Sequence, residues 1–290
     1  KWMLQFVQYK YKRFVKLSAL IYVLSLVLLT PFSLFAQQEP QFSQYMFNRL
    51  SYNPGYAGSN GAICLTGFYR NQWMGMELTD VYGEASSAST GETMNFSFDM
   101  PVRFLHGGIG ATIISDKIGY RDNIHAKIDY AFRIQFPTGN LAIGIEAQLF
   151  NSSLDKTQLI GGDVFGEDDQ IGTSLDPVLG DLSEQSDFLF DLGAGIYYQI
   201  PGKLYIGLST SKLLQTSSDN LYWDNRRFYY ILAGYEWALP AYPSLRILPS
   251  ALVKTDFVSK SAYHVDASLL LEWEHKIWGG MTYRVQDAMV

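Results

Sequence analysis

Residues 124–136 read IHAKIDYAFRIQF and alternate apolar with polar side chains along nearly their whole length. The apolar positions are Ile124, Ala126, Ile128, Tyr130, Phe132, Ile134 and Phe136. The polar positions between them are His125, Lys127, Asp129, Arg133 and Gln135. Successive side chains of a β-strand point to opposite faces of its sheet, so this stretch is predicted to be a strand with one apolar face.

The same alternation recurs along most of the chain. Further stretches lie at about 61–70, 94–100, 107–115, 141–149, 188–200, 204–213, 227–238, 245–255, 262–273 and 276–285. Together they predict about 11 strands, and a tilted strand needs ~9–11 residues to cross a bilayer. Their lengths therefore fit membrane-spanning strands.

The connections between these strands differ in length according to their order. The even-numbered ones are tight, at 101–106, 137–140, 201–203, 240–243 and 274–276. The odd-numbered ones are longer, at 71–90, 116–122, 153–186, 214–226 and 256–261. Short periplasmic turns and longer outer loops are typical of outer-membrane β-barrels. We therefore predict an all-β, antiparallel transmembrane barrel with a periplasmic N-terminus, and a soluble antiparallel sheet is the alternative.

The barrel prediction assigns each alternating side chain to lipid or to the lumen. Ile128 and Phe132 are expected to face lipid. The side chains expected to face the lumen are His125, Lys127, Asp129, Arg133, Glu146, Asp191, Glu236, Asp266 and Arg284. Charges of both signs could pair across strands and fill the interior.

Residues 1–36 have the layout of a secretory signal peptide. Basic residues precede an apolar run from Leu17 to Leu29, and Pro31 and Ala36 follow it. We predict cleavage near Ala36, with a retained membrane helix as the alternative. No later segment reaches the 18 apolar residues that a membrane helix requires.

Composition and spacing argue against several other functions. The net charge of -6 does not suit nucleic-acid binding. The single cysteine, Cys64, forms neither an internal disulfide nor a zinc cluster. His264, Asp266 and Ser268 share one strand face, but alternate strand positions lie ~6.6–6.8 Å apart, too far for a catalytic relay. We interpret them as lumen lining and expect no enzyme activity.

Metal and cofactor sites are also not expected. His106, His125 and His275 are too scattered to form a metal site. The acidic stretch 161–187 could hold calcium, but it lacks the ligand spacing and glycine of an EF-hand loop. We interpret it as a solvated outer loop, which could also contact a partner outside the cell.

Residues 38–61, QEPQFSQYMFNRLSYNPGYAGSNG, do not follow the strand alternation. Six residues at helical spacing are Phe42, Tyr45, Met46, Arg49, Leu50 and Asn53. Pro40 before them and Pro54 after them are ordinary helix boundaries. We expect a short helix or coil over 37–60 that plugs the periplasmic mouth, and it could also dock a partner through its aromatic residues.

This segment carries a specific family resemblance. QxPQFSQYMFN at 38–48, LSxNPxYAGS at 50–59 and YRNQW at 69–73 resemble the PorP/SprF family. The similarity continues in SDKIG (115–119), FDLGAGIYY (190–198), LYIGLSTSKL (204–213) and GGMTYRVQDA (279–288). The chain departs from the family at Arg49, where Pro is usual, and at Gly55, where Ala is usual.

The resemblance implies a closed barrel of 14 strands in the outer membrane of Bacteroidetes-like bacteria. Residues 61–290 would then form a barrel that lacks about three C-terminal strands, or whose edge a partner covers, because an open strand edge in lipid leaves backbone groups unsatisfied.

The resemblance also implies a role without catalysis or cofactors in type IX secretion and gliding motility. The partner would be a periplasmic ring or lipoprotein component, or a large secreted adhesin, and a small-solute channel is the alternative function. Candidate partner-binding residues are Phe42, Tyr45, Met46, Phe47, Asn48, Asn53, Pro54, Tyr56, Arg70 and Trp73.

Overall fold

The computed structural model describes residues 40–73, 89–119, 121–154, 186–218, 223–240, 242–256, 263–274 and 276–285. The predicted signal peptide and residues 155–185, which include most of the acidic stretch, lie outside the described residues. All described residues belong to one compact unit. Within the described ranges, no helix is long and apolar enough to cross a membrane.

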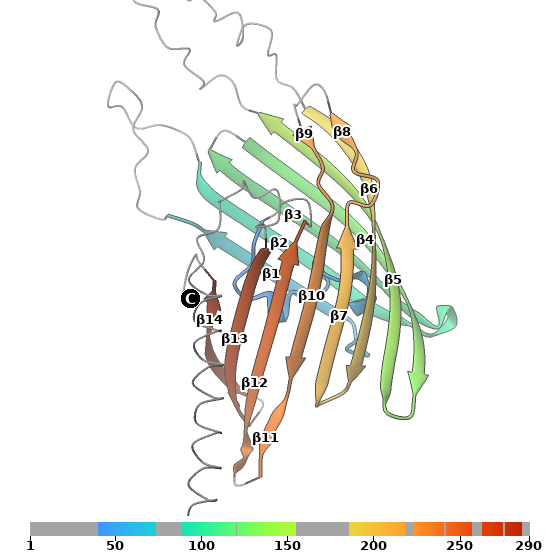
Figure 1. The fold of residues 1–290 in the computed structure, drawn as a ribbon, viewed down its shortest axis with the longest axis vertical. Helices are drawn as coiled ribbons and strands as arrows, with labels where there is room; N and C mark the ends of the chain where they lie inside the picture. The colour runs from blue at the N-terminus through green and yellow to red at the C-terminus, as the bar shows by residue number, and fades with distance from the viewer. Residues whose placement is uncertain are drawn as a thin grey trace, which may run out of the picture. The chain divides into compact units, whose positions relative to one another are not determined.

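The unit is built on a 12-stranded antiparallel sheet (Figure 1). Eleven strands follow one another in chain order: β1 (Cys64–Asn71), β2 (Ser89–Val102), β3 (Gly107–Gly119), β4 (Arg121–Phe136), β5 (Gly139–Leu154), β6 (Ser186–Ile200), β7 (Leu204–Ser211), β10 (Phe228–Tyr235), β12 (Tyr242–Thr255), β13 (Tyr263–Trp273) and β14 (Ile277–Arg284). The twelfth, β11 (Trp237–Leu239), pairs with β12, and β8 (Ser217–Ser218) and β9 (Trp223–Asp224) form a separate hairpin. All predicted strands are confirmed.

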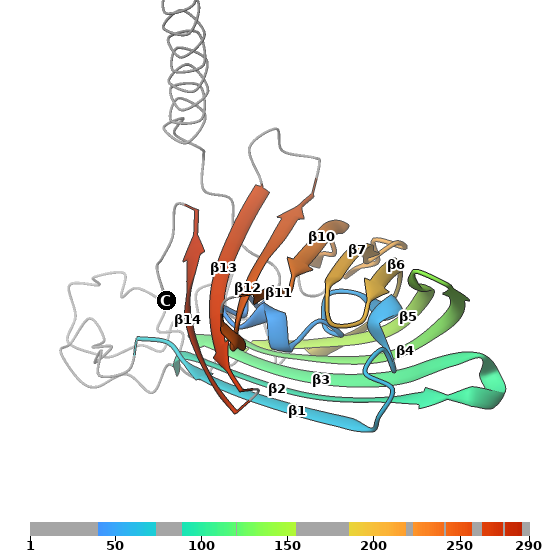
Figure 2. The ribbon, with the colours of Figure 1, turned by 90° about the horizontal axis from the view of Figure 1, so that it is seen from below.

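The sheet is consistent with a β-barrel, although no pairing among the described residues joins β1 to β14. Figure 2 shows that it curves around the segment that precedes β1. The face toward that segment is called the inner face below, and the opposite face the outer face.

The alternation separates the two faces as the sequence predicts. On β4, Ile128 is 70 % exposed on the outer face, whereas its neighbour Asp129 is 1 % exposed on the inner face. The β4–β5 register pairs Ile128 with Ala147 and Asp129 with Glu146, so the same division continues across strands. An apolar outer face and a polar inner face follow from this period of two.

The alternation of connection lengths holds with one exception. Tight turns join β4 to β5, β6 to β7 and β13 to β14, and the short 3-10 helix η3 (Arg103–Leu105) lies between β2 and β3. The predicted loop at 116–122 is wrong, because β3 ends at Gly119, β4 begins at Arg121, and Ile118 pairs with Arg121. Its polar residues belong to strand ends, where Lys117 and Asp122 form a cross-strand ion pair of 3.1 Å.

Residues 40–63, called the N-terminal segment below, lie along the inner face (Figure 2). They form two short 3-10 helices, η1 (Tyr45–Phe47) and η2 (Pro54–Tyr56). The α-helix suggested by the spacing of residues 42–53 is therefore wrong, and the coil alternative is closer. A surface helix buries one stripe of side chains, whereas consecutive residues of this segment are buried, including all of 50–58.

Candidate functional site

The N-terminal segment supplies much of the apolar core between itself and the inner face. Its contribution consists of Phe42, Tyr45, Met46, Leu50, Tyr52, Tyr56 and Ala57. Strand residues such as Tyr197, Tyr230 and Leu252 complete the same cluster. Burial of one such large side chain contributes about 1.5–3 kcal/mol, so the segment is an integral part of this interior.

The start of the segment is held by the last strands of the sheet. The Tyr45 hydroxyl lies 3.0 Å from Ser250 Oγ on β12 and donates to the Asp266 carbonyl oxygen on β13. Thr282 on β14 donates from its hydroxyl to the Ser43 carbonyl oxygen at 3.2 Å. Burial raises the pKa of Tyr45 above its usual value, and its hydrogen bond to Ser250 only partly opposes this. Tyr45 therefore remains a neutral donor.

Arg49 lies among three tyrosines in the middle of the segment. Its guanidinium carbon is 4.0 Å from the ring centroid of Tyr205 and 5.7 Å from that of Tyr56. Its Nη1 donates to the Tyr197 hydroxyl at 3.4 Å, and its Nε donates to the Met46 carbonyl oxygen at 2.9 Å. The charge is thus held by hydrogen bonds and cation–π contacts. Burial raises the pKa of Tyr56, and the Arg49 charge opposes the shift.

Asn53 connects the segment to two neighbouring strands. Its Nδ2 donates to the carbonyl oxygens of Ile196 on β6 and Leu208 on β7, at 3.1 and 3.3 Å. Its Oδ1 accepts from the Gly55 N–H at 2.8 Å and so caps η2. One buried amide thereby uses both of its polar ends, which fixes the position of the turn at Pro54.

Glycines on the inner face make room for this turn. A Cβ added at Gly144 on β5 would overlap the backbone of Pro54 and Gly55. A Cβ at Gly207 on β7 would lie 2.6 Å from Asn53 Nδ2. Glycine within a strand commonly marks the close approach of another backbone. Sequence reasoning missed these residues, although glycine at inward positions of alternating strands is a usable signal.

Charged side chains from β2 and β4 form hydrogen bonds with the backbone at the end of the segment. Arg133 donates from Nη1 to the Gly58 carbonyl oxygen and from Nη2 to the Ala57 carbonyl oxygen, both at 2.8 Å. Asp99 accepts from the Gly58 N–H at 2.9 Å. These charge-assisted bonds satisfy backbone groups that a helix would otherwise pair internally.

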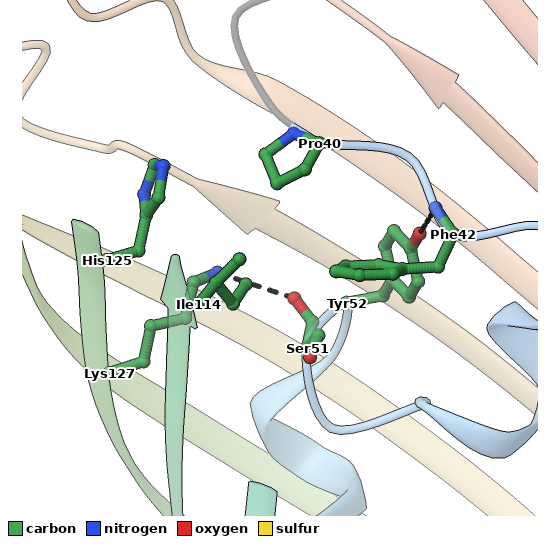
Figure 3. Close-up of a pocket in the computed structure, with 7 residues that line it drawn as sticks. All are labelled: Pro40, Phe42, Ser51, Tyr52, Ile114, His125 and Lys127. Carbon is green, nitrogen blue, oxygen red and sulfur yellow. Dashed lines mark hydrogen bonds between the residues drawn. The ribbon is translucent and has the colours of Figure 1, made fainter. Parts of the chain in front are cut away.

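A small cavity lies between the segment and strands β3 and β4 (Figure 3). Its walls are formed by Pro40, Phe42, Ser51, Tyr52, Ile114, His125 and Lys127. The Phe42 N–H donates to the Tyr52 hydroxyl at 3.2 Å, and Lys127 Nζ donates to the Ser51 carbonyl oxygen at 3.4 Å. With a volume of about 20 Å³, the cavity has room for one water molecule and is too small for an organic ligand.

The structure places the candidate partner-binding residues in two different environments. Buried against the sheet or within the segment are Phe42, Tyr45, Met46, Asn48, Asn53, Pro54 and Tyr56. Phe47 is 37 % exposed and Trp73 is 51 % exposed. Arg70 donates to the Gln41 carbonyl oxygen at 2.6 Å and so holds the segment to β1. Their role in binding a partner stays a prediction.

Asp266 and Ser268, which share a strand face with His264, form hydrogen bonds to the neighbouring strand. Asp266 accepts from Arg284 Nε at 2.8 Å, and Ser268 Oγ lies 2.8 Å from Thr282 Oγ1. Both pairs join β13 to β14 on the inner face, which agrees with the interpretation of these residues as lining. Lys127 and Glu146 likewise form an ion pair of 3.4 Å between β4 and β5.

A family model described as "Type IX secretion system membrane protein PorP/SprF" matches residues 34–290 of the chain. The search of curated proteins found no match to this chain.

Proposed function

The chain belongs to the PorP/SprF family of type IX secretion system membrane proteins, and we propose that it serves there as a non-enzymatic outer-membrane subunit for a protein partner. In this role the sheet spans the membrane with the tight turns and the N-terminal segment toward the periplasm. The long connections face the cell exterior.

The observation that carries the proposal is the filled inner face. Side chains or carbonyl groups of β1, β2, β4, β6, β7, β12, β13 and β14 bind the N-terminal segment directly. A solute that moved along this face would have to displace the whole segment and its buried core. This arrangement supports a subunit that binds proteins rather than a small-solute channel.

The partner we propose is another component of the secretion system. It is a periplasmic ring or lipoprotein component, or a large secreted adhesin that is exported or held at the surface. Phe47 and Trp73, the exposed aromatic residues among the candidates, are proposed as direct contacts. The buried candidates act indirectly, because they fix the segment that presents Phe47.

Site-specific cross-linking in native outer membranes tests the proposal. A photo-reactive amino acid placed at Phe47 or Trp73 is expected to capture a secretion component or an adhesin, identified by mass spectrometry. The same group at Ile128, exposed on the outer face, is the matched control and should capture none. Absence of such cross-links at Phe47 and Trp73, or sustained solute-selective current through the purified full-length protein in planar bilayers, would overturn the proposal.

A further inference from the structure

Asp129 on β4 is a buried carboxyl group, and its neighbours do not supply the hydrogen bonds that an ionised carboxylate needs. It is 1 % exposed, and neither of its carboxylate oxygens has a hydrogen-bond partner among the residues that the structure describes. Two other buried carboxylates of the inner face do have such partners. Asp191 accepts from the N–H groups of Leu192 and Leu214, both at 2.8 Å, and Asp266 pairs with Arg284. An ionised buried carboxylate without such partners is strongly disfavoured.

The groups that face Asp129 come from both neighbouring strands and from the N-terminal segment. Glu146 lies directly opposite on β5, and Lys127, two residues earlier on β4, contacts Glu146 Oε2 at 3.4 Å. On β3 the opposite residue is Gly110, over which the methyl groups of Leu50 lie. The charges in this group are therefore one ammonium and two carboxyls.

The next titratable residue along the same face of β4 is His125, whose Nδ1 lies 2.9 Å from Gln148 Nε2. Gly193 on β6 lies opposite Glu146, and Asp191 on β6 lies opposite Gln148. In the row of Asp129 itself, Asp99 on β2 lies opposite Gly110 and accepts from the Gly58 N–H. Asp191 accepts from the N–H groups of Leu192 and Leu214 at Oδ1 and from the Thr216 N–H at Oδ2. Lys127 alone cannot neutralise both Asp129 and Glu146.

We propose that Asp129 and Glu146 share one proton when the N-terminal segment is docked, and that loss of this proton weakens docking. Two ionised carboxylates are acceptors only and repel each other, whereas one proton turns Asp129 into a donor toward Glu146. The proton also makes the group of Lys127, Asp129 and Glu146 neutral. The pair titrates as a unit, since each carboxyl feels the charge of the other.

Lys127 transmits the state of the pair to the N-terminal segment. Its Nζ contacts both Glu146 and the Ser51 carbonyl oxygen, at 3.4 Å each. A second negative charge beside Glu146 draws this ammonium group away from Ser51 and places an unsolvated charge next to Leu50. Both changes oppose docking, so the proton acts as a pH-sensitive link between the sheet and the segment.

The sign of the pH dependence follows from proton linkage. The docked state binds one proton more than an undocked state in which Asp129 is solvated and titrates near ~4. Docking is therefore strongest below pH ~4 and weakens by up to about tenfold per pH unit as the pH rises, until the docked pair loses its proton.

Thiol labelling of the full-length protein in detergent micelles tests this. In a Cys64→Ser background, a cysteine introduced as Met46→Cys is buried when the segment is docked, whereas Gln44→Cys reports the reactivity of an exposed thiol of the same segment. The ratio of the two maleimide labelling rates is expected to rise with pH. The rise should disappear in Asp129→Asn and persist in Asp191→Asn, the matched control.

Infrared spectroscopy gives a second readout on the unmodified chain. The carbonyl band of a protonated carboxylic acid is expected at neutral pH, with its loss at alkaline pH and its absence in Asp129→Asn. A labelling ratio that does not change with pH, an equal rise in Asp129→Asn, or the absence of the band at neutral pH would each overturn the proposal. An ionised pair with a bound metal cation would be the explanation if the band were absent and a chelator increased labelling.

Discussion

The guanidinium carbon of Arg49 lies 4.0 Å from the ring centroid of Tyr205 on β7. This contact joins the middle of the N-terminal segment to the inner face of the sheet. The sequence does not predict these tyrosine surroundings of Arg49.

Arg49→Ala is expected to destabilise the protein by about 2 kcal/mol, because it removes a desolvated cation–π contact and hydrogen bonds from a charged donor. Urea unfolding of the purified protein in micelles measures the change. Arg49→Lys keeps the charge but loses the planar geometry and should recover only part of the stability. Equal stability of Arg49→Ala and the unmodified protein would contradict this assignment.

Gly144→Ala is expected to loosen the N-terminal segment, since a methyl group at this position overlaps the backbone of Pro54 and Gly55. Overpacking of this kind costs about 1–3 kcal/mol. Faster trypsin cleavage after Arg49 would report the effect. Gly67→Ala on β1, where a Cβ meets nothing within 4 Å, is the control and should cleave like the unmodified protein.

Ile128→Arg is expected to cost about 2–4 kcal/mol in a bilayer if this outer-face position lies at the membrane midplane. Folding titrations in lipid vesicles measure the cost, and Ile128→Ala separates the charge from the loss of side-chain volume. Unimpaired insertion of Ile128→Arg would argue strongly against lipid contact at this position.

Alkaline pH is expected to weaken the docking of the N-terminal segment through Tyr45 and Tyr56. Burial raises the pKa of both hydroxyls above the usual value of ~10. Their contribution to stability is therefore complete below pH ~10 and is lost as the pH rises through the higher folded-state pKa. Absorbance titration of tyrosinate alongside urea unfolding tests this, and Tyr45→Phe should show a smaller alkaline loss than the unmodified protein.

The strand content and the two faces of the sheet could be predicted from the sequence. Side-chain direction alternates within each strand whatever the rest of the chain does. The sequence therefore predicts that Ile128 and Asp129 lie on opposite faces, and their burial confirms it. The boundaries of the strands are harder to predict from the sequence. The polar residues around Gly119 suggested a loop, but cross-strand pairing extends β3 and β4 through them.

The path of the N-terminal segment could not be predicted in the same way. Spacings of three and four suggested a helix, but the segment buries residues on all sides and exchanges internal hydrogen bonds for bonds to strands. Asn53 reaches the Ile196 carbonyl oxygen across 143 residues of sequence, and Gly144 matters only because Pro54 lies above it. The sequence around such residues has no local pattern from which their contact partners could be predicted.

The sequence by itself therefore determined an antiparallel sheet with an apolar outer face and a polar inner face, together with the family, because strand alternation and short motifs are local. Only the tertiary structure decided what fills the inner face, which glycines admit it and which charges hold it. Those contacts join residues far apart in the chain, and their energies exist only once the sheet has curved around the segment.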